Sequence, residues 1–240
     1  MEKTAILFDL DGTLLPMDYE EFARAYLKLL AQTSAPLGYE PKALIDALWA
    51  GGSRIAANDG THTNYEVFWD TFSERLGDRE KVMSDIPAFN RFYTHEFELA
   101  RSASGDNPLA PEAVRLARQK ADCVILATMP QFPRDGIITR LRWVNLSPDD
   151  FDDITGYEDW SYSKPNPAYY TAILAKHGVR PENALMIGND VCEDISAAQA
   201  AGIRTYLVTD WMIGADDTPE TAQGTFVQLL DFLKDFQFEQ

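Results

Sequence analysis

Two patterns of hydrophobic residues divide this chain. Between residues 18 and 101, apolar and aromatic side chains recur every three or four positions, as in the series Phe68, Phe72 and Leu76. Elsewhere, apolar residues gather in short unbroken runs, and segments with helical spacing separate these runs. The first pattern predicts helices with one buried face, and the second predicts strands that are buried on both faces.

The short apolar runs predict the strands of a parallel sheet. The predicted strands are residues 4–9, 122–127, 153–155, 184–187 and 205–208. The helices predicted around and between the later strands are residues 110–120, 134–142, 167–177, 193–201 and 220–235. Because strands alternate with helices, we predict an α/β protein with a doubly wound, Rossmann-like parallel sheet.

The all-helical segment interrupts this alternation directly after the first strand. We therefore expect a core domain of residues 1–15 and 102–240 that carries an inserted α-helical cap of residues 16–101. A length of 240 residues suits one α/β domain with a modest insertion. The aromatic series within the segment favours a small helical core over a ligand site.

Charge and composition narrow the possible partners. The net charge is −17, which argues against nucleic acids and anionic membranes. No apolar run approaches the ~18 residues of a membrane span, and we expect no secretory signal at the N-terminus. Only Cys123 and Cys192 are present, too few for a disulfide framework or a zinc site, so we expect a cytoplasmic protein. Nothing in the sequence indicates an oligomeric state.

The first strand is followed at once by the motif Asp9-Leu10-Asp11-Gly12-Thr13. Open α/β sheets bind their ligands at the carboxyl ends of the strands, where these two carboxylates are expected to lie. Like charges two residues apart are unfavourable unless a cation or a proton lies between them. A plain Asp-Gly loop is the alternative interpretation of the turn.

Polar residues with possible chemical roles follow two other strands. Thr128 follows the strand 122–127, and Asp190 and Asp194 follow the strand 184–187. Lys164 lies between them, within Ser163-Lys164-Pro165-Asn166-Pro167. Taken alone, each has an ordinary explanation, since Thr favours strands, Lys is usually a surface residue, and Asp often caps a helix.

The ordered set of Asp-x-Asp-Gly-Thr, Thr, Lys and Asp-x-x-x-Asp resembles the haloacid dehalogenase-like superfamily, in its phosphatase branch. The resemblance runs from residue 4 to about residue 210 and looks like the phosphoglycolate phosphatase-like group, whose helical cap lies between the first and second motifs. It implies that Asp9 is the nucleophile and forms an aspartyl-phosphate. It further implies that Asp11 acts as the general acid and base, and that Thr128 and Lys164 bind the phosphate.

The resemblance also implies a Mg²⁺ cofactor. The implied ligands are Asp9, the backbone carbonyl of Asp11, Asp190 and Asp194. Members of the family often have Gly-Asp where this chain has Asn189-Asp190, and the four-residue offset to Asp194 selects Asp190 as the ligand. The residues expected to support the site without reacting are Gly12, Thr13 and Asn189.

The motifs favour a phosphatase that hydrolyses a small phosphorylated metabolite. Dehalogenases of the same superfamily lack the second Asp of the first motif, which this chain has as Asp11. Only 35 residues separate Thr128 from Lys164, too few for the second type of cap, so the substrate should enter beneath residues 16–101. Two alternatives stay open: a phosphomutase like β-phosphoglucomutase, and a non-catalytic, phosphate-binding regulatory module.

Overall fold

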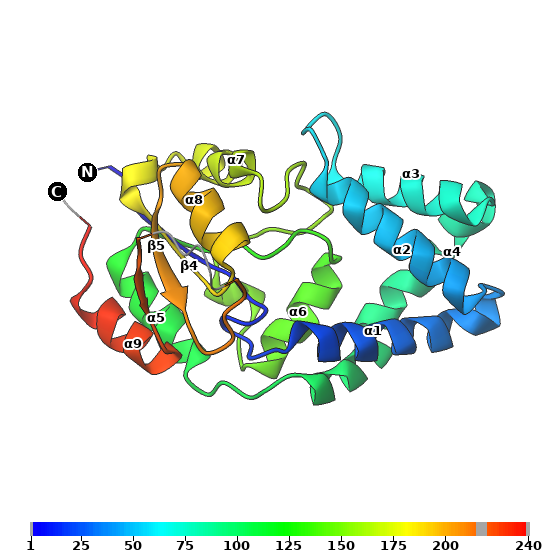
Figure 1. The fold of residues 1–240 in the computed structure, drawn as a ribbon, viewed down its shortest axis with the longest axis horizontal. Coiled ribbons are helices and arrows are strands. Elements are labelled where there is room, and N and C mark those ends of the chain that lie inside the picture. The colour runs from blue at the N-terminus through cyan, green and yellow to red at the C-terminus, as the bar shows by residue number, and fades with distance from the viewer. Residues whose placement is uncertain (1, 215–219, 239–240) are drawn as a thin grey trace.

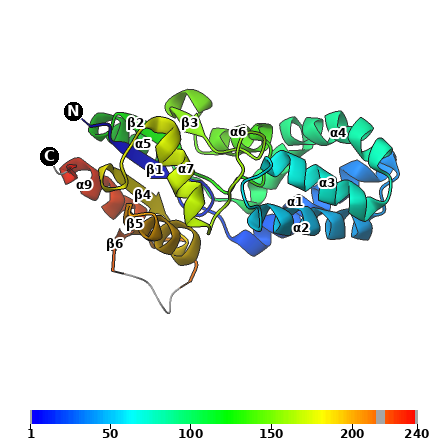
Figure 2. The same ribbon diagram turned by 90° about the horizontal axis from the view of Figure 1, so that it is seen from above.

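The computed structural model describes residues 2–214 and 220–238. Its centre is a six-stranded sheet in the order β3-β2-β1-β4-β5-β6, and every neighbouring pair is parallel (Figures 1 and 2). The strands are β1 (Ala5–Phe8), β2 (Cys123–Leu126), β3 (Asp153–Ile154), β4 (Ala184–Gly188), β5 (Arg204–Val208) and β6 (Ala222–Gly224). The predicted doubly wound α/β fold is thus confirmed.

Helices cover both faces of the sheet. These are α5 (Ala110–Lys120), α6 (Arg134–Trp143), α7 (Pro167–His177), α8 (Ala197–Ala200) and α9 (Phe226–Asp235). In β1, Ile6 and Phe8 join a hydrophobic cluster with α5, α6 and α9, whereas Ala5 and Leu7 join another with α7 and α8. Successive side chains of a strand point to opposite faces, so an unbroken apolar run is what a strand covered on both faces needs.

The last predicted helix required a correction. Residues 220–235 were expected to be helical throughout, but residues Ala222–Gly224 form β6, which pairs with β5 at the edge of the sheet. The helix α9 begins only at Phe226, because the side chains and backbone N–H groups of Thr225 and Gln228 form a capping box there. The strand β6 pairs through its backbone and has no apolar run that could have revealed it.

Four helices follow β1 and stand to one side of the sheet, away from both chain termini (Figures 1 and 2). They are α1 (Tyr19–Ser34), α2 (Pro41–Ala56), α3 (Asn64–Leu76) and α4 (Arg79–Thr94), and we call them the cap helices. Each begins at a side chain that accepts backbone N–H groups of its first turn, which stabilises the helix start. These capping residues are Asp18, Glu40, Thr63 and Asp78.

Shorter helical segments complete the chain. The 3₁₀ segments are Ala35–Leu37, Glu96–Ala103, Pro148–Asp150 and Pro181–Asn183, and a π-helical segment, Val191–Ser196, leads into α8. The predicted helix 193–201 therefore starts two residues earlier than expected. Within the part of the chain that the structure describes, no helix is both long and apolar enough to cross a bilayer.

Besides the two segments of chain that connect them, hydrogen bonds and hydrophobic contacts join the cap helices to the rest of the protein. The backbone N–H groups of Asn64 and Tyr65 donate to the carbonyls of Trp160 and Tyr157 at 2.7 and 2.8 Å. One continuous hydrophobic cluster also runs from the sheet into these helices. The boundaries 1–15, 16–101 and 102–240 therefore stay a prediction.

Candidate active site

The motif after β1 forms a tight turn at the carboxyl end of the sheet's centre. Gly12 has a φ of +86°, and a Cβ there would lie 2.2 Å from the amide nitrogen of Asn189. Only glycine fits this position without displacing Asn189. Thr13 donates its hydroxyl to the Asn189 side-chain oxygen at 3.0 Å and to Asp9 Oδ2 at 3.3 Å. The three residues predicted to support the site therefore lie beside Asp9.

Lys164 joins two of the predicted site residues. Its side chain is 1% exposed, and its Nζ lies 2.8 Å from Asp9 Oδ1 and 2.5 Å from Asp194 Oδ1. Burial alone would lower the pKa of Lys164, but the charges of Asp194 and Asp9 outweigh burial and raise it well above the ordinary value. A charged lysine is thus held against Asp9, which excludes the interpretation of a solvated surface lysine.

Asp194 has both carboxylate oxygens engaged. Its Oδ2 accepts the backbone N–H groups of Asn189 and Asp190 at 3.1 and 3.0 Å, while its Oδ1 pairs with Lys164. Burial raises the pKa of Asp194, and Lys164 opposes this shift. Asp194 therefore fixes the loop after β4 and orients the lysine.

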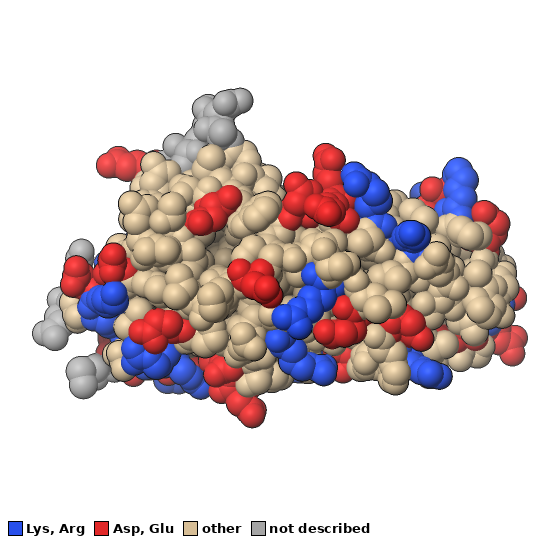
Figure 3. Space-filling view, turned by 90° about the horizontal axis from the view of Figure 1, so that it is seen from below, with Lys and Arg blue, Asp and Glu red and all other residues tan. Residues whose placement is uncertain are grey.

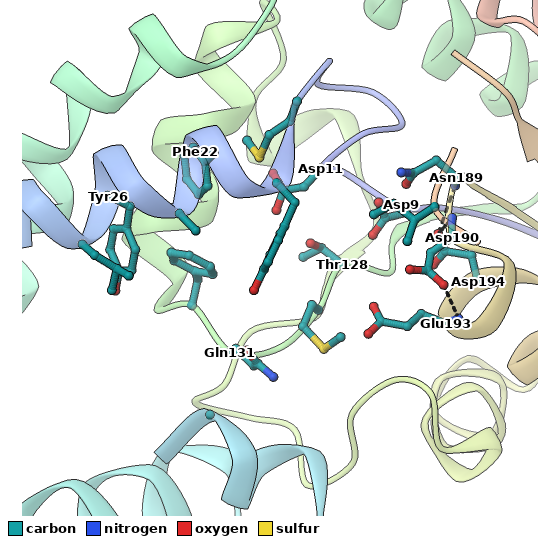
Figure 4. Close-up of a pocket in the computed structure, with 18 of the residues that line it drawn as sticks. Asp9, Asp11, Phe22, Tyr26, Thr128, Gln131, Asn189, Asp190, Glu193 and Asp194 are labelled. Carbon is teal, nitrogen blue, oxygen red and sulfur yellow. Dashed lines mark hydrogen bonds between the residues drawn. The ribbon is translucent and has the colours of Figure 1, made fainter. Parts of the chain in front are cut away.

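Asp190 begins the π-helical segment. Its Oδ1 accepts the N–H groups of Cys192 and Glu193, both at 2.8 Å, so it does cap the segment. Its side chain also lines the cavity that contains Asp9 (Figure 4). A capping role and a role in ligand binding are compatible, because a carboxylate offers about four acceptor positions.

Thr128 lies where β2 ends and is 1% exposed. Its backbone carbonyl accepts the hydroxyls of Thr155 and Tyr169 at 2.7 and 2.9 Å, which holds the residue in place. Its own Oγ1 is buried and has no hydrogen-bond partner in the structure, and the residue borders the cavity. Buried hydroxyls are nearly always hydrogen-bonded, so this one is available to a ligand oxygen.

Arg140 is a site residue that sequence reasoning missed. It projects from α6, is fully buried, and donates through Nη1 to Asp11 Oδ2. Its guanidinium also lies 4.2 Å from the ring centre of Phe132. The sequence did contain an indication of this role, because Arg140 lies with Ile137 and Leu141 on the apolar face of α6. A buried arginine on such a face needs an acidic or polar partner.

The pKa of Asp11 suits a proton donor. Burial raises it above the ordinary value, and the charge of Arg140 reduces but does not cancel that shift. A carboxyl must hold its proton near neutral pH to act as a general acid, and burial is a common means to that end. The environment therefore shifts the pKa of Asp11 in the direction that its predicted role needs.

The carboxylates fit a magnesium ion by their chemistry. Asp9, Asp11, Asp190 and Asp194 all border one cavity, and Mg²⁺ prefers oxygen ligands and keeps several waters. Among residues 2–214 and 220–238, however, no three His, Cys, Asp or Glu side chains gather into a ready metal cage. Both carboxylate oxygens of Asp194 are engaged, whereas Asp9 Oδ2 accepts only the 3.3 Å hydrogen bond from Thr13, so Asp9 and Asp190 have more oxygen capacity left for an ion.

The cavity has a volume of about 440 Å³ and lies between the carboxyl end of the sheet and the cap helices α1, α2 and α3. Phe22, Tyr26 and Phe68, predicted to form a helical core, are indeed buried, but they also line the cavity. Figure 4 shows Phe22 and Tyr26 projecting from α1 on the side opposite Asp190 and Glu193. The sequence pattern did not reveal that this core has an open side.

Glu193 is a second lining residue that the sequence analysis missed. Burial raises its pKa to about 8, and Lys164 opposes the shift. From the core, the loop after β2 contributes Met129, Gln131 and Phe132. This loop therefore borders the cavity.

The central strands of the parallel sheet end in carboxylates, and these lie near a buried lysine and an unpartnered hydroxyl. Such a site is typical of a hydrolytic α/β enzyme. The family model of haloacid dehalogenase-like hydrolases matches residues 3–202. The chain belongs to this family.

Relatives and solved structures agree with this assignment. The chain is 28% identical over 240 residues to a phosphoglycolate phosphatase of Aliivibrio fischeri, with 95% of each chain covered. It is 28% identical over 216 residues to a ribulose-1,5-bisphosphate 5-phosphatase of Halopiger xanaduensis, covering 85% of this chain and 84% of the relative. The chain is thus an enzyme of the phosphatase branch.

A similar fold occurs in the HAD hydrolase YfnB of Bacillus subtilis, whose structure is described as bound to magnesium and as showing interdomain movement. Its TM-score is 0.57 at 20% identity, with 98% of this chain and 100% of that chain covered. At this identity the likeness shows the shared fold alone.

Proposed function

We propose that this enzyme hydrolyses a small phosphomonoester, with Mg²⁺, through an aspartyl-phosphate on Asp9. The observation that carries the proposal is the contact of Asp9 with the buried, charged Lys164 beside the unpartnered hydroxyl of Thr128. Phosphoryl transfer depends mainly on positioning and on neutralising charge, and these residues provide both.

In the first step, a carboxylate oxygen of Asp9 attacks phosphorus, and the bond from phosphorus to the alcohol oxygen breaks. Asp9 Oδ2 is the freer oxygen, because it accepts only the 3.3 Å hydrogen bond from Thr13, whereas Oδ1 pairs with Lys164. Asp11 donates its proton to the departing alcohol oxygen. The products of this step are the free alcohol and the phosphorylated Asp9.

In the second step, water attacks the aspartyl-phosphate, and Asp11 accepts its proton. Inorganic phosphate leaves, and Asp9 and Asp11 return to their starting states. Lys164 Nζ and Thr128 Oγ1 hold phosphate oxygens throughout, so that charge developing on the transferring group is offset.

The residues that would hold Mg²⁺ are Asp9, Asp190 and the backbone carbonyl of Asp11. When bound, the ion would offset the negative charge of the phosphate and of the carboxylates. We propose that Asp194, which the resemblance assigned to the ion, acts instead through Lys164 and the loop after β4. The magnesium-bound YfnB, similar in fold, supports the choice of ion.

We further propose that residues 16–101 act as the cap over a core of residues 1–15 and 102–240. The cap helices form one wall of the cavity, and closure of that wall would exclude bulk water during the first step. No feature of the site favours a phosphomutase or a regulatory module over a phosphatase.

The test is phosphate release from a panel of phosphomonoesters, with Mg²⁺ and with EDTA. We expect turnover that needs the metal and that falls roughly 10³-fold or more in Asp9→Asn. Asp231→Asn, at an exposed position on α9, serves as the matched control and should retain full activity. Turnover unaffected by Asp9→Asn would contradict the proposal, and rapid transfer of the phosphate to a second sugar hydroxyl instead of water would identify a mutase.

A further inference from the structure

The cavity that adjoins Asp9 is apolar on the side away from the carboxylates. Its walls there come from α1, α2, α3 and the loop after β2. The apolar lining residues are Met17, Phe22, Ala23, Leu27, Leu48, Trp49, Phe68, Met129 and Phe132. In the proposed reaction, the phosphate lies at Asp9, so this region would hold the alcohol part of the ester.

None of the described residues that line the cavity is a lysine, an arginine or a histidine. The two nearby cations are buried and already paired, since Lys164 contacts Asp9 and Asp194, and Arg140 contacts Asp11. The ionisable side chains that do line the cavity are acidic or phenolic. No cationic side chain among the described lining residues is therefore placed to pair with a second anionic group on the substrate.

The polar groups of the cap wall are few and uncharged. The hydroxyl of Tyr26 shares a 2.8 Å hydrogen bond with the hydroxyl of Tyr93, so it is already paired. Tyr19 adds a hydroxyl to this wall, and Gln131 of the loop after β2 adds an amide from the core. Trp49, 48% exposed, extends the apolar surface towards solvent. This wall can contact a ring or an aliphatic chain and give it one or two hydrogen bonds.

A second anion in this space would lose water without gaining a cation. Burying an unpaired charge is costly, and none of the described lining residues carries a positive charge that could offset it. A neutral ring or chain would instead displace water from apolar walls. The free energy of binding in this region therefore favours an uncharged leaving group over a charged one.

We infer that the substrate carries its only negative charge on the phosphate and has an uncharged, apolar or aromatic alcohol as its leaving group. This inference rests on the proposed phosphatase activity and narrows its substrate class. It separates this enzyme from the two relatives described above, because phosphoglycolate carries a carboxylate and ribulose-1,5-bisphosphate a second phosphate.

The decisive experiment compares kcat/KM for benzyl phosphate and 4-carboxybenzyl phosphate. The two esters have similar alcohols and differ by one carboxylate far from the reacting bond. We expect kcat/KM to favour benzyl phosphate by about 10²-fold, the scale at which a pocket rejects a group it cannot pair. Equal values, or a preference for the carboxylated ester, would overturn the inference.

A variant with an added cation tests the cause of the preference. Leu48→Arg places a guanidinium on the cap wall, outside the proposed catalytic residues, and Leu48→Met is the matched control. We expect Leu48→Arg to reduce the preference by about tenfold, and Leu48→Met to leave it unchanged. A Leu48→Arg variant that folds normally, judged by its Tm, but keeps the full preference would count against a missing cation as the cause.

The outcomes also separate this inference from the proposed function. Turnover of phosphoglycolate with no turnover of benzyl phosphate would overturn the inference and leave the phosphatase activity standing. Hydrolysis of neither ester nor of any other phosphomonoester, with Mg²⁺ present, would overturn both.

Discussion

At the scale of single residues, the contact between Arg140 and Asp11 sets the conditions for acid catalysis. Burial raises the pKa of Asp11, and the guanidinium limits the rise. Sequence reasoning found Asp11, because the motif after the first strand contains it, but it did not find Arg140. The two residues lie 129 positions apart, and only the folded chain brings them together.

A double-mutant cycle can measure this pairing. Arg140→Met should lower the free energy of unfolding by about 3 kcal/mol, because it leaves the buried side of Asp11 without its cation. Adding Asp11→Asn to that variant should restore part of the loss, which gives a coupling of at least ~1 kcal/mol in urea unfolding. The control is the exposed pair Lys42–Asp46, whose coupling should be much smaller, because exposed ion pairs are screened by solvent. Additive effects at Arg140 and Asp11 would show that the contact contributes nothing.

A second residue-scale prediction concerns pH and lies outside the active site. Burial would raise the pKa of Asp153, but hydrogen bonds from Lys176 and His177 outweigh burial and lower it. A group whose pKa is lower in the folded state stabilises the protein above its unfolded pKa of ~3.9, and this stability is lost as the pH falls through the folded value. Asp153→Asn should therefore cost about 1 kcal/mol at pH 6 and progressively less below pH ~4.

Unfolding by urea at a series of pH values would check this prediction. The exposed Asp149→Asn is a suitable control and should follow the wild type at every pH. A constant difference between wild type and Asp153→Asn from pH 3 to pH 7 would contradict the assigned cause.

At the scale of elements, the sequence predicted those strands and helices whose burial leaves a pattern. Strands β1, β2, β4 and β5 are covered on both faces, so each has an unbroken apolar run from which the strand could be predicted. The edge strand β6 was missed because backbone pairing, not an apolar side-chain pattern, places it in the sheet. The open side of the cap's aromatic core was missed for a related reason, since helical spacing shows which face is buried but not what it faces.

The start of α3 offers a prediction at this scale. Asn64 is fully buried, and its side chain accepts from Asn58 Nδ2 at 2.8 Å and donates to the carbonyl of Tyr162 at 3.2 Å. Asn64→Ala leaves these buried groups unpaired and should cost about 2 kcal/mol of stability. Hydrogen exchange should become faster at the first turn of α3 and in residues 157–162, and stay unchanged in β1. Exchange that rises equally everywhere would indicate global destabilisation instead.

At the scale of the whole molecule, the net charge of −17 opposes the approach of a phosphate ester. Figure 3 shows acidic and basic side chains interspersed on the face it displays, without a large patch of either sign. The repulsion therefore comes from the total charge, and the attraction comes from the buried Lys164 and a bound cation. Long-range repulsion of this kind is screened by salt, whereas buried contacts are screened much less.

The KM for a phosphomonoester should accordingly fall as salt is added. With Mg²⁺ held at saturation, we expect a decrease of roughly two- to threefold between 10 and 150 mM KCl, while kcat stays constant. A KM that rises with salt would show that local attraction at the cavity mouth outweighs the total charge.

The bond between Asn64 and Trp160 has a consequence for how one turnover follows another. The backbone carbonyls of Tyr157, Trp160 and Tyr162 accept hydrogen bonds from the start of α3, and Lys164 follows two residues after Tyr162. If the cap helices swing outward to release the alcohol, those hydrogen bonds must break, and the strain then falls on the segment that precedes Lys164. Opening of the cap helices would therefore release the product and also displace Lys164 from Asp9. Because Lys164 holds the phosphate in the proposed mechanism, the affinity for inorganic phosphate would fall when the cap helices open.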